Sequence, residues 1–246
     1  MDEDLPARLA AVRDRIAGAC AAAGRDPGEV RLLLAVKTQP VSAILAALGA
    51  GADLLGHNRA QELEATGPAL DAPGVPRHEM HFIGRLQTNK VNQVLRWATC
   101  VETVDSARLA ERLDRAVAAG TGADGTPPGA LDVLVQVNTS GEDTKSGVDP
   151  GGALALAALV GGLPHLRLGG LMTVGARSAD PDVVRRSYDL LAEVRAAVLA
   201  SGEPGTSGAT ELSMGMSGDL EPAVAAGATI VRVGTAVFGA RDQGTR

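Results

Sequence analysis

The sequence predicts an α/β fold in which eight parallel strands close into a single (β/α)8 TIM barrel. Eight short apolar runs recur along the 246 residues, and stretches with helical periodicity lie between most of them. This alternation is typical of a parallel sheet with right-handed crossovers. Eight such units in a chain of this length suit a closed barrel better than an open, doubly wound sheet.

The first expected element is an amphipathic helix over about 5–23. Its apolar positions Leu9, Val12, Ile16 and Ala19 recur at helical spacing, and Gly24 provides a stop after the last of them. Such a stripe predicts one buried face, against which the rest of the fold packs.

The eight apolar runs are short, which favours buried strands over helices. They lie at 31–36, 53–56, 81–84, 100–104, 131–137, 168–174, 210–214 and 230–234. Helical periodicity is clearest at 41–51, 89–98, 106–120 and 181–202. Segments rich in Gly and Pro at 121–130 and 202–209 predict surface loops, because the alternation resumes after each one. We therefore expect one domain over 1–246.

Composition limits the kind of core and of partner. Hydrophobic residues make up 45% of the chain but aromatic residues only 2%, so the core must consist of Ala, Val, Leu and Ile. Cys20 and Cys100 lie far apart, and neither they nor the four histidines have metal-binding spacing. We expect both cysteines to be buried in a reducing compartment, and no metal site.

Charge and hydropathy argue against two classes of partner. The net charge is −6, and no cluster of Lys or Arg provides the basic face that nucleic-acid binding needs. The acidic N-terminus lacks the apolar segment of a signal peptide, and no stretch is long enough to span a bilayer. These features predict a cytoplasmic protein with neither nucleic acid nor membrane as partner.

In such a barrel the functional face lies at the carboxyl ends of the strands. Lys37, one of only three lysines, directly follows the apolar run LLLAV at the end of the first strand. Partial desolvation there would favour the neutral amine, which attacks aldehydes to form an imine. The alternative is a lysine that extends out of the mouth or pairs with a carboxylate.

The segments after the last two strands have the composition of a phosphate site. Barrels often bind phosphate with these two loops and a short helix N-terminus. Gly234 would let the backbone approach the ligand, and Thr235, Ser217 and Ser213 would add hydroxyl groups. The alternative is that these small residues only shape tight turns.

Two further positions leave alternatives open. Arg232 shares a strand face with Gly234, and alternation alone does not decide whether that face points into the barrel or toward the helices. Asp105 and Ser106 are interpreted as the N-terminal cap of the helix over 106–120, not as catalytic groups.

Five segments together resemble the pyridoxal phosphate homeostasis proteins, formerly called proline synthetase co-transcribed homologues. They are LLLAVKTQP, HFIGRLQTNK, VLVQVNTSGEDTKSGV, GGLMTVG and LSMGMSGDLEPAVAAGATIVRVGTAVFGAR, and the resemblance runs from about residue 30 to 241. It implies a barrel like the N-terminal domain of alanine racemase, with pyridoxal 5′-phosphate (PLP) held as a Schiff base on Lys37.

The resemblance also implies roles for individual residues. Arg232 is expected to face the pyridine nitrogen, and Gly234, Thr235, Ser217 and Ser213 to hold the phosphate. Asn58, also expected to bind the cofactor, lies in a segment that usually reads Gly-Glu-Asn in the family. Here the segment is Gly56-His57-Asn58, so the family's carboxylate is absent at position 57.

The implied function is buffering or delivery of PLP, with apo-forms of PLP enzymes as partners and a monomeric state. An arginine at the ring nitrogen cannot accept its proton, which weakens the ring as an electron sink. The only tyrosine, Tyr188, is expected on the outer ring of helices, so two-base racemisation would lack one base. The alternatives are a weak racemase, with Lys37 and either water or Lys145 as bases, and a cofactor-free Schiff-base aldolase.

Overall fold

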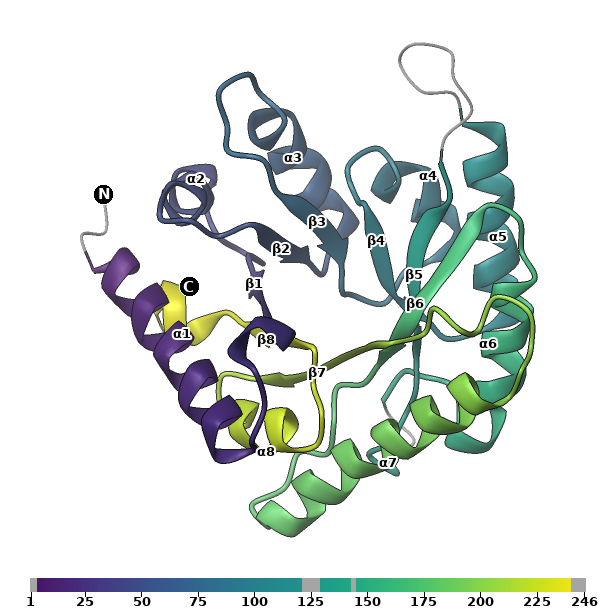
Figure 1. Cartoon of the computed structure of the whole chain (residues 1–246). Coiled ribbons are helices and arrows are strands. Elements are labelled where there is room, and N and C mark those ends of the chain that lie inside the picture. The colour runs from purple at the N-terminus through teal and green to yellow at the C-terminus, as the bar shows by residue number, and fades with distance from the viewer. Residues whose placement is uncertain (1–3, 121–128, 143–144, 240–246) are drawn as a thin grey trace.

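A computed structural model of the chain describes residues 4–120, 129–142 and 145–239. Eight parallel strands form one closed barrel in sequence order, and β1 (Arg31–Ala35) pairs with β8 (Ile230–Val233) to complete it. Figure 1 looks into the ring of strands, with the long helices around its outside. The predicted fold class is confirmed.

The remaining strands are β2 (Leu54–His57), β3 (Glu79–Phe82), β4 (Cys100–Val104), β5 (Leu131–Gln136), β6 (Leu166–Met172) and β7 (Glu211–Met216). The α-helices are α1 (Leu5–Ala22), α2 (Val41–Gly49), α3 (Ala60–Leu70), α4 (Val91–Val94), α5 (Ala107–Ala119), α6 (Ala153–Gly161), α7 (Pro181–Ala200), α8 (Leu220–Ala225) and α9 (Thr235–Phe238). Short 3-10 turns are η1 (Pro27–Glu29), η2 (Thr88–Lys90) and η3 (Pro150–Gly152).

The N-terminal helix α1 packs beside the last two helices of the chain, α8 and α9 (Figure 1). Its buried residues include Leu9, Val12 and Ile16, the stripe that the sequence predicts. Arg15 pairs with Glu221 of α8 at 2.8 Å on the exposed side of this contact. The two ends of the described chain are therefore held together by the apolar face of one helix.

Two predicted elements show how the expected boundaries differ from the structure. Strand β3 begins at Glu79, two residues before the apolar run, because a charged residue that faces the barrel interior gives no apolar signal. The helix expected over 89–98 is α4, which is four residues long and tightens into a turn after Val94. The loop at 202–209 is present, whereas the loop predicted at 121–130 lies outside the described residues except for its last two.

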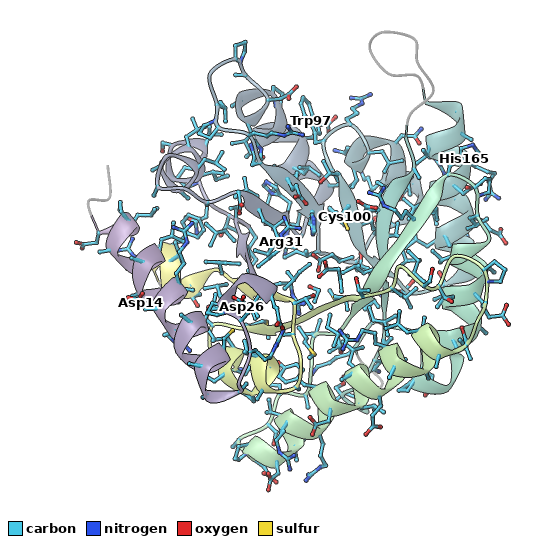
Figure 2. All side chains as sticks on the ribbon, in the orientation of Figure 1. Asp14, Asp26, Arg31, Trp97, Cys100 and His165 are labelled. Carbon is cyan, nitrogen blue, oxygen red and sulfur yellow. The ribbon has the colours of Figure 1, made fainter. Side chains whose placement is uncertain are left out.

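Side-chain alternation divides the buried residues into two layers. The larger apolar layer lies between the strands and the helices. Inside the ring, apolar contacts form two small clusters, one of Leu33, Leu54 and Ile230 and one of Cys100, Leu134 and Met172. Figure 2 shows Arg31 and Cys100 within the ring of strands, so charged and apolar side chains share the barrel interior.

None of the helices in the described ranges is both long and apolar enough to cross a membrane. Within the same ranges, no group of three or more His, Cys, Asp or Glu side chains is arranged to hold a metal ion. Cys20 and Cys100 are both buried free thiols.

Candidate functional site

Lys37 lies at the mouth of the barrel formed by the carboxyl ends of the strands. Strand β1 ends at Ala35, and the alternation that places Leu33 inside the barrel puts Lys37 on the same face. The sequence predicts a partly desolvated lysine, but the Lys37 side chain is exposed. It makes no hydrogen bond or ion pair with any other described residue, so its amine is free to react.

The peptide after Lys37 is held in a strained conformation. Thr38 has a φ of 61°, the left-handed region that costs a β-branched residue about 1–3 kcal/mol. Its N–H donates to Oε2 of Glu62 at 3.1 Å, and its hydroxyl donates to the carbonyl of Lys37 at 2.6 Å. Glu62, in the first turn of α3, therefore fixes the backbone beside the lysine. No pattern in the sequence singled out this glutamate.

The loops after β7 and β8 bring two predicted hydroxyl groups together. The Thr235 hydroxyl donates to Oγ of Ser217 at 3.3 Å, which joins the start of α9 to the β7–α8 loop. The first N–H groups of a helix have no partner within it, so Thr235 and Ala236 present backbone donors on the same side. This arrangement can bind an anion.

Gly234 lies where strands β8 and β1 meet at the mouth. A Cβ built on this residue would lie 3.1 Å from the carbonyl oxygen of Ala35, tighter than ordinary packing. The register pairs Val233 with Leu34, so the glycine sits one residue further along, beside the end of β1. The start of α9 and the chain leading to Lys37 are therefore neighbours.

Arg232 points into the barrel, which decides the alternative that the sequence left open. Only 6% of its surface is exposed. Its Nη1 donates to Oγ of Ser213 at 2.8 Å, and its Nη2 donates to the carbonyl of Thr173 at 2.7 Å. Burial lowers the pKa of this guanidinium, and the nearby Glu102 carboxylate opposes that shift.

Ser213 has a different place from the one that the sequence suggests. Its side chain is fully buried, and its hydroxyl donates to Oε2 of Glu102 at 2.5 Å while it accepts from Arg232. A hydroxyl covered in this way is not exposed at the mouth. Ser213 supports Arg232 from below, whereas Ser217 remains with Thr235 in the outer loops.

A buried histidine and glutamate continue the contacts below Ser213. Nδ1 of His81 lies 2.6 Å from Oε1 of Glu102. Burial disfavours the imidazolium, but hydrogen bonds to Glu102 and Glu79 outweigh it and raise the pKa of His81 to about 9. Burial likewise opposes the charge of Glu102, yet His81 and Arg232 hold its pKa below the ordinary value. Sequence reasoning missed His81 and Glu102, which it assigned to apolar strands.

Asn58 follows β2 and is half-buried at the edge of the mouth. Its Oδ1 is covered and has no hydrogen-bond partner within the described residues. The ends of β2 and β3 are pressed together here, because a Cβ on Gly84 would lie 2.0 Å from the carbonyl oxygen of Asn58. Asn58 thus has an unused acceptor and a rigid backbone.

Replacing Gly84 with alanine is expected to lower the free energy of unfolding by about 2 kcal/mol, because overpacking forces the β2 and β3 ends apart. Urea denaturation would measure the loss. Gly49→Ala is the matched control, since a Cβ there meets nothing within 4 Å. Equal stabilities of the two variants would contradict the close approach at Asn58.

His57, which stands where the resembled family usually has glutamate, faces away from the mouth. Its Nε2 lies 3.2 Å from the hydroxyl of Thr66 on α3, and its side chain is buried. Burial lowers the pKa of His57 to about 4, although Glu62 opposes the shift, so the ring is neutral near pH 7. The histidine at position 57 therefore affects the packing between β2 and α3.

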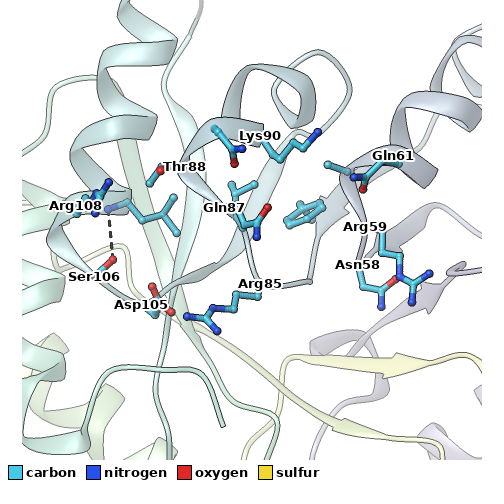
Figure 3. A pocket seen from close by; sticks show the side chains of 15 residues that line it. Asn58, Arg59, Gln61, Arg85, Gln87, Thr88, Lys90, Asp105, Ser106 and Arg108 are labelled. Atoms are coloured by element: carbon cyan, nitrogen blue, oxygen red, sulfur yellow. Dashed lines mark hydrogen bonds between the residues drawn. The ribbon is translucent and has the colours of Figure 1, made fainter. Parts of the chain in front are cut away.

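A cleft of about 700 Å³ lies beside Asn58, at the ends of β2, β3 and β4 (Figure 3). Its charged lining consists of Arg59, Arg85, Lys90, Arg108 and Asp105. The side chains of Arg85, Lys90 and Arg108 form no ion pair within the part of the chain that the structure describes. Arg59 pairs with Glu62 at 3.5 Å, but the other three cations still outnumber the carboxylate of Asp105. The cleft therefore has a positive potential, although the chain as a whole is acidic.

Three other predicted residues also have clear places. Ser106 caps α5, because its Oγ accepts from the N–H of Leu109 at 3.4 Å. The ammonium of Lys145 is bound by the carbonyl of Gly175 at 2.6 Å and by Glu142 at 2.7 Å. Tyr188 lies on α7 in the outer ring, but its side chain is fully buried, and burial raises its pKa.

Comparison with known proteins identifies the relatives of this chain. The alanine racemase N-terminal domain family matches residues 8–242. The "Pyridoxal phosphate homeostasis protein" of Escherichia coli (strain K12) is 40% identical over 239 residues, which cover 97% of each chain. The chain belongs to the pyridoxal phosphate homeostasis protein family.

Two solved structures of similar length share the fold of this family member. A protein of unknown function from Bifidobacterium adolescentis is 42% identical, with a TM-score of 0.89 and 97% of each chain covered. PipY of Synechococcus elongatus PCC7942, with PLP bound, is 30% identical, with a TM-score of 0.75 and coverage of 96% of this chain and 100% of PipY. The family assignment and the barrel agree with the resemblance in the sequence.

Proposed function

We propose that this family member binds PLP at the barrel mouth as a Schiff base on Lys37 and buffers or delivers the cofactor. One observation carries the proposal: an exposed lysine follows β1, and the end of β1 lies next to Gly234, in the loops that also hold Ser217 and Thr235. A phosphorylated aldehyde matches both features. The PLP-bound PipY structure supports this ligand, since PipY shares the barrel.

The residues of the mouth suit this ligand in separate ways. The neutral amine of Lys37 would attack the aldehyde carbon, and water would leave as the C=N bond forms. The backbone donors at the start of α9, with the hydroxyls of Thr235 and Ser217, would hold the phosphate. Asn58 offers an unused acceptor at the rim. When bound, PLP supplies a conjugated aromatic ring that can withdraw electrons.

Arg232 would weaken the bound ring as an electron sink, which alone does not exclude catalysis. We place its guanidinium toward the pyridine nitrogen, where it can donate a hydrogen bond but cannot accept a proton. A neutral ring withdraws electrons less well than a protonated one, so bond cleavage next to the bound amine is favoured less. This supports the proposal that the protein carries the cofactor.

A weak racemase is the second candidate, and it needs a base on the other side of the substrate. Lys145 is held by Glu142 and Gly175, and Tyr188 is buried. Neither side chain is free to act, so water is the base left for that alternative. The aldolase alternative differs in colour, because it uses no PLP.

The proposal is tested by titrating the purified protein with PLP and reducing it with borohydride. We expect a yellow protein and a reduced adduct that peptide mass spectrometry places on Lys37. A protein that takes up no PLP would overturn the proposal. Exchange of the α-hydrogen of alanine for deuterium at enzyme-like rates would favour the racemase.

We further infer that the protein is a cytoplasmic monomer and passes PLP to apo-enzymes. The two buried free thiols, Cys20 and Cys100, suit a reducing compartment. Light scattering would test the monomeric state, and cell fractionation would test the cytoplasmic location. Mixing PLP-loaded protein with an apo-enzyme should restore activity faster than an equal concentration of free PLP. Equal rates would contradict delivery.

PLP is an anion and the cleft is positive. We therefore expect PLP to associate faster than it would by diffusion without electrostatic attraction. Removing two cations with Arg85→Ala and Arg108→Ala should slow association several-fold at low salt, because the cleft attracts the anion. Stopped-flow absorbance would measure the rate. The difference should vanish in molar salt, where the Debye length is about 3 Å.

Arg186→Ala is the matched control, because Arg186 is an exposed arginine on α7, away from the cleft. It removes one positive charge from the whole protein, as each of the single variants Arg85→Ala and Arg108→Ala does, and is compared with these. Equal slowing by this variant would mean that net charge, not the cleft, attracts the ligand.

A further inference from the structure

A chain of charged and polar side chains runs through the barrel interior below the mouth. From Arg232 it passes through Ser213 to Glu102, with contacts of 2.8 and 2.5 Å. From Glu102 it continues to His81 at 2.6 Å. All four side chains are at least nine-tenths buried.

The chain of contacts reaches the opposite, amino-terminal end of the barrel. Nε2 of His81 lies 3.5 Å from Oε2 of Glu79, and Oε1 of Glu79 accepts from Nη2 of Arg31 at 2.7 Å. Arg31 and Glu79 are partly exposed at that end. Charges of alternating sign therefore connect solvent at one end of the barrel to Arg232 near the other.

A gain in folding stability does not explain why charged side chains are buried in this network. A buried ion pair loses so much hydration that apolar side chains of similar volume are often as stabilising. The barrel interior already has apolar clusters on two sides, with Leu33, Leu54 and Ile230 in one and Cys100, Leu134 and Met172 in the other. The charged network takes the place of apolar packing beneath Arg232.

The contacts fix the orientation of the guanidinium. A guanidinium has five N–H donors in one plane. One is directed to Ser213 and one to the carbonyl of Thr173, so the edge and the plane of the group are set. Glu102 accepts from Ser213, and this leaves a hydroxyl lone pair directed at Arg232. His81 holds the other oxygen of the same carboxylate.

We propose that Glu102 is a positioning residue for the cofactor ring, and that it acts through Ser213 to hold Arg232 in its place. This rests on the proposed function, in which PLP occupies the mouth. Glu102 supplies the counter-charge that keeps the buried guanidinium in the barrel. Ser213 links that carboxylate to Arg232, and its hydroxyl sets the direction in which the guanidinium points. The contact with His81 stabilises the ionised form of the Glu102 carboxylate and restricts its movement.

The test uses the full-length protein with two substitutions. Glu102→Gln keeps the shape of the side chain and removes its charge, and Ser213→Ala cuts the link to Arg232 without touching the contact between Glu102 and His81. Each is expected to weaken PLP binding about tenfold and to shift the absorption band of bound PLP, since hydrogen bonds to charged groups are strong. Ser201→Ala, at the far end of α7, is the control and should change neither.

Three readouts separate the outcomes: the PLP dissociation constant, the absorption band, and the unfolding midpoint without PLP. A lower midpoint with unchanged affinity and band for both variants would overturn the proposal, because the network would then only support the fold. If Glu102→Gln does not fold, Ser213→Ala alone decides between these results. A wild-type protein that binds no PLP would instead refute the proposed function.

Discussion

Replacing Lys37 with alanine is expected to leave a colourless protein that takes up no PLP covalently. Lys37 is one of only three lysines, and its side chain is exposed just after the end of β1, with no side-chain partner among the described residues. Loss of the only covalent link should weaken PLP binding at least a hundredfold, leaving the phosphate contacts alone. Absorbance titration, and mass spectrometry after borohydride reduction, would measure the loss.

Lys90→Ala is the matched control for that experiment. Lys90 lines the neighbouring cleft and, like Lys37, has no ion pair among the described residues. This variant should remain yellow and keep the adduct on Lys37. A yellow Lys37→Ala protein, with the adduct on Lys90 or Lys145, would place the covalent site elsewhere. Both variants should unfold at the wild-type midpoint, since the amines of Lys37 and Lys90 make no hydrogen bond or ion pair among the described residues.

Raising the pH from 6.5 to 9 is expected to lower the free energy of unfolding by roughly 3 kcal/mol, at about 1.4 kcal/mol for each unit of pKa. Against the effect of burial, hydrogen bonds to Glu102 and Glu79 raise the pKa of His81 from 6.5 to about 9. The folded state therefore holds a proton that the unfolded chain releases. This stabilisation is complete below pH 6.5 and disappears as the pH rises through 9.

Urea denaturation at several pH values between 6.5 and 8.5 would measure this slope. Other groups interfere little above pH 7.5, because His57 is then neutral in both the folded and the unfolded chain, and cysteine thiols ionise near 9 in the unfolded chain. His81→Gln should flatten the slope, whereas His78→Gln, at a half-buried histidine that contacts the carbonyl of Pro76 and lies outside the network, should not. If His81→Gln fails to fold, the imidazole can be titrated by NMR in the wild type. A midpoint near 6.5 would contradict the buried imidazolium.

The barrel could be predicted from the sequence because its signals are local. Each strand is a short apolar run with a helical stretch after it, and the right-handed crossover makes consecutive strands neighbours. The boundaries failed where a polar side chain faces inward. Glu79 begins β3 and pairs with Arg31, which is distant in the sequence, so the run of apolar residues underestimates the strand.

The candidate site shows the same division. Lys37 and the loops with Gly234 and Thr235 could be found because strand ends converge at one face of a barrel. The direction of Arg232 and the place of Ser213 could not be found, since alternation gives two faces without saying which is inside. Glu62 and Glu102 gave no signal, because each acts on a residue far away in the chain.

The sequence by itself determined the alternation of strands and helices, the candidate lysine at the end of the first strand and the family, since these depend on residue order. Only the tertiary structure decided that Lys37 is exposed and that Ser213 lies beneath Arg232. It alone also brought His81 and Glu102 into a charged network inside the barrel. The physical reason is that closing the barrel brings side chains from β3, β4, β7 and β8 into contact across its axis. Burial and ionisation depend on those neighbours.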